Sequence, residues 1–115
     1  MTMLPIVLLL TGGVALGLYM GLNYLKGVRN KPLLIGAHVL LGLASLEPMA
    51  IALSRKAEIG PLAPGGLVLA FASGAMTPII AKQSRTATSW ALGTHAAIAA
   101  CAYVYILILM SRFWT

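Results

Sequence analysis

Two histidines are the only imidazoles in this 115-residue chain, and both lie inside apolar stretches. His38 lies in the segment GAHVLLG and His95 in the segment GTHAAIA. Ionisable side chains in such stretches are rare and commonly functional. A neutral imidazole is a preferred axial ligand of haem iron, and two imidazoles can bind the iron from both sides. The chemistry that these residues indicate is therefore ligation of a redox metal.

Small side chains share the helical face of each histidine. They are Gly42 and Ser45 beside His38, and Ala91, Ala99 and Ala102 beside His95. A porphyrin needs a flat slot of this kind, because bulky side chains would collide with its plane. The sequence predicts one haem b with His38 and His95 as metal ligands. A second interpretation stays open, in which each histidine is a polar group hydrogen-bonded to a neighbouring helix.

Other metal chemistry fits this pattern less well. Zinc takes three or four protein ligands, and no further His, Cys or carboxylate falls at the level of the histidines. Met76 is the one rival ligand, but a His–Met pair would leave one histidine unexplained. The single Cys101 excludes an internal disulfide and covalent attachment of c-type haem. We expect Cys101 to be a small core residue.

The composition of the chain predicts that the apolar stretches around the two histidines lie in a bilayer. The chain is 60% hydrophobic and 9% charged, whereas a soluble domain has about 25% charged residues. Four apolar stretches, 4–25, 33–53, 62–81 and 88–110, are long enough to cross a hydrocarbon core of about 30 Å as helices. We expect an all-α fold, a four-helix transmembrane up-down bundle that forms one integral membrane domain over residues 1–115.

The charges between the stretches predict an orientation. The formal net charge is +6, but the basic residues lie at the ends of apolar stretches and form no single polar face, so no nucleic-acid partner is expected. Five of them occupy the first and third connections: Lys26, Arg29, Lys31, Lys82 and Arg85. By the positive-inside rule, both termini are outside a bacterial inner or organellar membrane.

The second and fourth helices run parallel in this arrangement, so the depths of the histidines can be compared. His38 follows Pro32 by six residues, and His95 follows Thr88 by seven. At the rise of a helix, both lie about 9–10 Å inside the cytoplasmic end. The two imidazoles could therefore face each other at one level.

Small residues recur at every fourth position in the first and third stretches. The two ladders are Gly13, Gly17 and Gly21, and Gly66, Ala70 and Gly74. Such ladders let helix backbones approach closely in lipid. They indicate tight packing within the bundle, against partner subunits or in a homo-oligomer.

The four spans, with GAHVLLG on the second and GTHAAIA on the fourth, resemble membrane b-type cytochromes of the cytochrome b561-like group. The resemblance implies haem held by histidines on an antiparallel helical bundle, and electron transfer across or along the membrane. It extends to His38 and His95, with Gly42 as the small residue near the ring. The dihaem members need four histidines, so two histidines imply a single haem.

Glu47 belongs to a different face of the second helix. It follows His38 by nine residues, which is half a turn away in direction and about 13 Å along the axis. An ionised carboxyl at this depth is costly. Three interpretations stay open: a proton or quinone site, a contact with a partner subunit, or an interfacial position without function.

These observations leave three functions in competition. The first is a membrane electron-transfer protein with one haem b, which could be a subunit of an oxidoreductase. The second is a non-catalytic accessory or assembly subunit of a larger respiratory or photosynthetic complex. The third is a small transporter that depends on Glu47.

Overall fold

The structure is a computed structural model that describes residues 4–55 and 60–113. In these residues all regular secondary structure is helical: α1 (Leu4–Leu25), α2 (Pro32–Arg55), α3 (Leu62–Ile80) and α4 (Arg85–Phe113). The all-α prediction is confirmed, and each helix is long and apolar enough to cross a membrane. α4 extends beyond both ends of the apolar stretch predicted at 88–110. Part of the predicted second connection, 56–59, lies outside the described residues.

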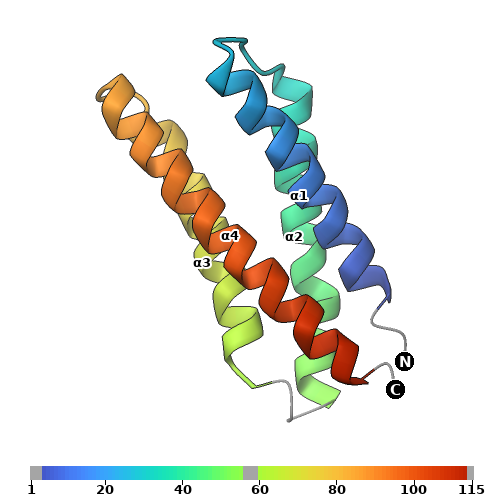
Figure 1. Cartoon of the computed structure of the whole chain (residues 1–115). Helices are drawn as coiled ribbons and strands as arrows, with labels where there is room; N and C mark the ends of the chain where they lie inside the picture. Colours follow the sequence, from blue (N-terminus) through green and yellow to red (C-terminus); the bar gives the residue numbers. More distant parts are fainter. Residues whose placement is uncertain (1–3, 56–59, 114–115) are drawn as a thin grey trace. The chain divides into compact units, whose positions relative to one another are not determined.

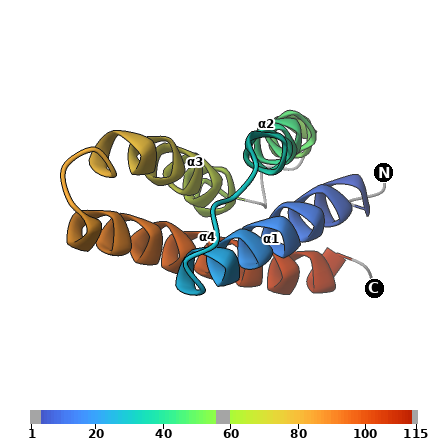
Figure 2. The same cartoon turned by 90° about the horizontal axis from the view of Figure 1, so that it is seen from above.

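The helices pack as two compact units, which are two antiparallel hairpins. α1 lies beside α2, and α3 lies beside α4 (Figures 1 and 2). Each unit therefore has its own interior, made by the facing sides of its two helices.

A glycine turn and asparagine side-chain hydrogen bonds stabilise the connection of the first hairpin. Gly27 has a φ of 72°, a left-handed conformation that glycine adopts without the steric cost of a side chain. The Asn30 side-chain amide donates to the Met20 carbonyl at 3.0 Å, and the Asn23 amide donates to Asn30 Oδ1 at 3.0 Å. Pro32 then begins α2, where its missing N–H costs no helix hydrogen bond.

The connection of the second hairpin is shorter because a serine starts the next helix early. The Ala87 N–H donates to Ser84 Oγ at 3.0 Å, which is a side-chain N-cap. The helix therefore begins at Arg85 and not at the predicted Thr88.

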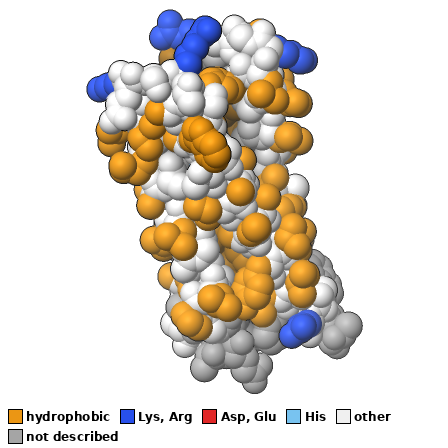
Figure 3. Space-filling view, turned by 60° about the vertical axis from the view of Figure 1, so that its left-hand side comes forward, with side chains coloured by type: hydrophobic (Ala, Val, Ile, Leu, Met, Phe, Trp, Pro, Cys, Tyr) orange, Lys and Arg blue, Asp and Glu red, His pale blue; other side chains and the backbone are white. Residues whose placement is uncertain are grey.

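Each hairpin buries one narrow strip of side chains. The strip of the first hairpin comprises Ile6, Leu10, Ser45, Met49 and Ala52, and that of the second comprises Ala63, Leu67, Ala70, Ala102, Ile106 and Met110. The outward faces are largely apolar, and Lys and Arg side chains lie toward the helix ends (Figure 3). Such a surface is compatible with an integral membrane protein, since lipid tails favour apolar side chains.

The two hairpins are repeats of one unit. A shift of 57 residues carries Ile6 to Ala63, Leu10 to Leu67, Ser45 to Ala102 and Met49 to Ile106, all of them buried. It also carries 36–38 (GAH) to 93–95 (GTH), and 51–55 (IALSR) to 108–112 (ILMSR). The two serines of the latter segments make the same bond: Ser54 Oγ donates to Ile51 O at 2.8 Å and Ser111 Oγ to Ile108 O at 2.7 Å. Sequence, burial and hydrogen bonding therefore agree on a tandem repeat.

Candidate functional site: two histidines on repeated hairpins

His38 bridges the two helices of the first hairpin. Its Nδ1 lies 2.9 Å from the backbone carbonyl oxygen of Gly13 on α1. A carbonyl oxygen can only accept a hydrogen bond, so Nδ1 carries the proton and donates it. The lone pair of the neutral ring then resides on Nε2.

His95 makes the equivalent bridge in the second hairpin. Its Nδ1 lies 2.8 Å from the carbonyl oxygen of Ala70 on α3. The shift of 57 residues that relates His38 to His95 also relates Gly13 to Ala70. Because the Ala70 oxygen can likewise only accept, the proton of His95 resides on Nδ1 and the lone pair on Nε2.

A glycine makes room for each imidazole. A Cβ atom built on Gly17 would lie 3.0 Å from Cε1 of His38, and one built on Gly74 would lie 2.8 Å from Cε1 of His95. Real Cβ contacts are essentially never shorter than 3.0 Å. The shift of 57 residues also relates Gly17 to Gly74. In each hairpin, the absence of a side chain at the glycine lets the facing helix pack closely against the imidazole.

The predicted ladders act mainly inside the hairpins. Gly17 and Gly74 lie against the imidazoles. A Cβ atom built on Gly66 would lie 3.2 Å from the Cβ of Ala102. Ala70 is buried, and its carbonyl oxygen accepts the hydrogen bond from His95. These close approaches account for small residues without a partner protein. The predicted oligomer contact through the ladders stays a prediction.

The predicted slot residues divide into two groups. Ser45 and Ala102 are only 1% and 8% exposed, and Ala102 lies against Gly66 of α3. The Ser45 hydroxyl donates to Gly42 O at 2.7 Å, so it is already used within α2. Both side chains are therefore buried in the structure, and the predicted slot stays a prediction.

The remaining slot residues stay accessible to a neighbouring group. Gly42, Ala91 and Ala99 are half-buried. A Cβ built on Gly42 would meet nothing within 4 Å in the described structure, and the same holds for Gly36 and Gly93, which precede the two histidines by two residues. Packing within the hairpins does not explain these three glycines.

The start of each helix is a poor reference for the depth of the two histidines. α4 begins at Arg85, one turn earlier than expected, so the distances of His38 and His95 from their helix starts differ. The acceptor carbonyl is the better reference, because each imidazole binds a carbonyl 25 residues earlier in the chain. By this measure the two histidines hold the same position in their hairpins.

Three other predicted residues lie on outer faces. Glu47 is exposed on α2 between the buried residues Ser45 and Met49. Met76 is 49% exposed on α3. Cys101 is also exposed on α4, so its prediction as a core residue is wrong. It lies within the apolar run 96–110, but the hairpin buries only one face of the helix.

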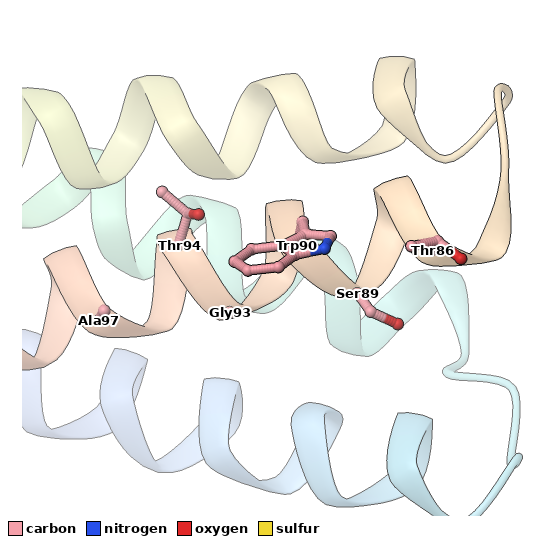
Figure 4. Close-up of a pocket in the computed structure, with 6 residues that line it drawn as sticks. All are labelled: Thr86, Ser89, Trp90, Gly93, Thr94 and Ala97. Atoms are coloured by element: carbon pink, nitrogen blue, oxygen red, sulfur yellow. The ribbon is translucent and has the colours of Figure 1, made fainter.

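A shallow hollow lies on the outer face of α4 (Figure 4). It is lined by Thr86, Ser89, Trp90, Gly93, Thr94 and Ala97. All six residues come from one helix, and the hollow exists because Gly93 and Ala97 are small beside Trp90. A second hollow, lined in part by Leu62, Gly66 and Cys101, lies between α3 and α4. Neither hollow is lined by a histidine.

Sequence reasoning missed the partners of the histidines. Gly13 and Ala70 accept through backbone carbonyl oxygens, and residue identity does not predict which backbone oxygen will accept a hydrogen bond. Ser73, whose Oγ lies 3.1 Å from Nδ1 of His95, was also missed. The constant shift of 57 residues was an available signal for Gly17 and Gly74, the glycines beside the two imidazoles, but not for Ser73, whose counterpart is Leu16.

Comparisons with family models, curated proteins and solved structures gave no match to this chain. The resemblance to the cytochrome b561-like group therefore stays a prediction based on the two short histidine segments.

Proposed function

We propose that this chain is an integral membrane electron-transfer protein in which His38 and His95 hold one haem b. The observation that supports the proposal best is the shared Nδ1–H···O=C hydrogen bond. Metal-binding histidines commonly donate their second ring nitrogen to a carbonyl, which fixes the tautomer and makes the ligating nitrogen more basic. Both Nε2 atoms then carry the lone pair that an iron ligand needs.

The repeat adds a geometric reason for a shared site. Each repeat contains two helices long enough to cross a membrane, so both hairpins would enter the bilayer from the same side. Equivalent histidines would then lie at equivalent depth. Two imidazoles at one depth would both be able to hold a single haem.

The donor set fits haem better than it fits other metals. In the part of the chain that the structure describes, no group of three or more His, Cys, Asp or Glu side chains could hold a metal ion. Haem iron needs only two protein ligands, because the porphyrin supplies the others. Bound there, haem would supply a one-electron carrier that alternates between ferric and ferrous iron. The chain's own contribution is to fix both imidazole rings and to offer the small residues Gly36, Gly42 and Gly93 beside them.

Reduced-minus-oxidised difference spectroscopy of the purified protein tests this proposal. We expect a Soret band and an α-band, with one haem per chain after reconstitution or expression in haem-sufficient cells. His38→Gly and His95→Gly should each lose the two-histidine spectrum. Preparations that stay colourless and bind no added haem would refute the proposal.

A non-catalytic subunit of a membrane complex is the second candidate. It is favoured by the same contacts, since each imidazole already joins two helices of its own hairpin and needs no cofactor to explain it. In that case the histidines serve only stability, and the outer apolar faces would contact partner subunits. A colourless protein that co-purifies with fixed partners after gentle detergent extraction would support this function.

Glu47 contributes to neither candidate through a contact in the structure. Its exposed position on α2 is consistent with a proton or quinone site, with a partner contact, and with the transporter considered from the sequence. Quinone as electron donor or acceptor stays a prediction, which Glu47→Gln would test by its effect on quinol-dependent haem reduction.

A further inference from the structure

The two hollows of the second hairpin form one continuous groove, because Ala97 lines both of them. The groove follows α4 from Thr86 to Tyr105, and we call it the α4 groove. Leu62 and Gly66 of α3 add to its lining at the Tyr105 end. The groove therefore belongs wholly to one hairpin.

The lining of the α4 groove changes from polar to apolar along its length. Thr86 and Ser89 lie at the end near the connection between α3 and α4, and Ala97 lies further along the helix (Figure 4). Beyond Ala97 the lining is largely apolar and includes Leu62, Ile98 and Ala102. A ligand that fits this groove needs one polar end and one long apolar part.

Basic residues lie beside the polar end of the groove. Arg85 is the first residue of α4, and Lys82 lies three residues earlier; both are exposed. The two acidic residues of the chain are Glu47 and Glu58, so residues 60–113 contain none. The charge of the second hairpin therefore favours an anionic group at this end.

The groove also matches the dimensions of one membrane leaflet. α4 has 29 residues, about 43 Å at the rise of a helix, which exceeds the hydrocarbon core of about 30 Å. The ends of α4 can therefore lie among the headgroups. Trp90 is 75% exposed, and tryptophan favours the interface between headgroups and hydrocarbon. From Trp90 to Cys101 the helix rises about 16 Å, close to the depth of one leaflet, about 15 Å.

We propose that the α4 groove binds one anionic phospholipid. The phosphate lies near Arg85 and Lys82 at the polar end. One acyl chain lies along Ala97 and Cys101, whose small side chains leave room for it. A neighbouring helix could also pack on small residues, but basic residues at one end and a lining that turns apolar favour a lipid. The proposal is independent of the haem, because neither hollow is lined by a histidine.

The first hairpin provides a matched comparison. The shift of 57 residues relates Ala97 to Leu40, which is 66% exposed. A leucine at position 97 would extend into the groove, whereas the other repeat already carries an exposed leucine at this place. Ala97→Leu therefore fills the groove with a side chain that the hairpin fold accommodates.

Quenching of Trp90 fluorescence by brominated lipids tests the site in the full chain. Trp114→Phe leaves Trp90 as the only tryptophan. In phosphatidylcholine vesicles, brominated phosphatidylglycerol should quench at lower mole fractions than brominated phosphatidylcholine. Arg85→Gln and Lys82→Gln should each reduce this preference about fivefold, the usual contribution of one basic residue near an anionic lipid surface. Arg112→Gln, near the other end of α4, should leave it unchanged.

Groove-filling variants separate a site from a general attraction of charge. Ala97→Leu keeps every charge and should remove most of the preference, and Cys101→Leu should act in the same way one turn further along. Ala100→Leu adds the same side chain at an exposed position that is not among the lining residues of either hollow. It should keep the wild-type preference. Circular dichroism checks that each variant retains its helices.

Two results would overturn the proposal. The first is equal quenching by the two brominated lipids in the wild type, or a preference that survives in both Ala97→Leu and Cys101→Leu. The second is protection of Trp90 from both lipids, because a neighbouring protein would then cover the groove.

Discussion

The first and second hairpins bury corresponding side chains, yet they differ in the polar groups around them. Both hold an imidazole against a glycine and a backbone carbonyl. In the second hairpin the Ser73 hydroxyl also lies 3.1 Å from Nδ1 of His95, and the residue at the corresponding position of the first hairpin is Leu16. Only the first carries a carboxyl and a proline, Glu47 and Pro48, where the second has Val104 and Tyr105. The two hairpins thus share the imidazole that bridges their helices. They differ in the polar side chains and the proline, which could give each hairpin a separate role.

The largest expected effect tests whether the connections of the two hairpins lie on the same side of the membrane. If both hairpins cross the membrane as repeats, their connections lie on one side. In a Cys101→Ser background, Val28→Cys and Gln83→Cys should both react with an impermeant maleimide in inverted vesicles, and neither should react in intact cells. Labelling from opposite sides would contradict a repeat of two membrane-crossing helices.

The next effect concerns the glycines under the imidazoles. A Cβ at position 74 would lie 2.8 Å from the His95 ring, and overpacking of this kind costs roughly 1–3 kcal/mol. We expect Gly74→Ala to lower the free energy of unfolding by about that amount, measured by helix loss during titration with dodecyl sulfate. Gly17→Ala should cost less, since its Cβ would lie at 3.0 Å.

Gly36→Ala is the matched control for both substitutions, because a Cβ there meets nothing within 4 Å. Alanine also favours a helix over glycine by roughly 1 kcal/mol. We therefore expect no loss of stability in this variant. A loss as large as that of Gly74→Ala would show that the imidazole contact is not the cause.

A smaller effect concerns the imidazole hydrogen bonds themselves. His38→Leu and His95→Leu keep apolar bulk but remove the bond to Gly13 O or Ala70 O. Hydrogen bonds between membrane helices contribute about 0.6 kcal/mol on average and ~1.7 at most. Both variants should lose a similar amount in the same unfolding assay. A loss confined to one hairpin would mean that the two bridges are not equivalent.

The smallest effect concerns the one buried polar side chain of the first strip. Ser45 donates its hydroxyl to its own helix, and the repeat has Ala102 at the corresponding position. Ser45→Ala should change the free energy of unfolding by less than about 0.5 kcal/mol, a typical size for a change away from special contacts. A larger loss would show that Ser45 contributes something that its counterpart does not.

Much of the fold could be predicted from the sequence because apolar length alone defines helices of this kind. The bounds of α1 were predicted directly, and those of α2 and α3 to within two residues. The start of α4 was not, because Ser84 and not Thr88 supplies the cap. The imidazole of His38 lies against Gly13 O and Gly17 of α1, contacts that were not predicted.

The acceptors of the histidines could not be predicted from residue types, because Gly13 and Ala70 act through backbone oxygens. The repeat could have been found, since GAH and GTH are followed at equal spacing by IALSR and ILMSR. Few residues are identical between the halves. The halves mainly share the positions of small and buried residues. The burial and hydrogen bonds of the structure reveal this correspondence.

Haem titration of His38→Gly and His95→Gly, side by side and with imidazole added back, tests the central claim most directly. The account predicts that each variant loses the two-histidine spectrum and that free imidazole restores it in both, because each variant lacks one of two ligands to the same iron. A spectrum that survives in either variant would contradict the claim that equivalent histidines of two repeated hairpins hold one haem.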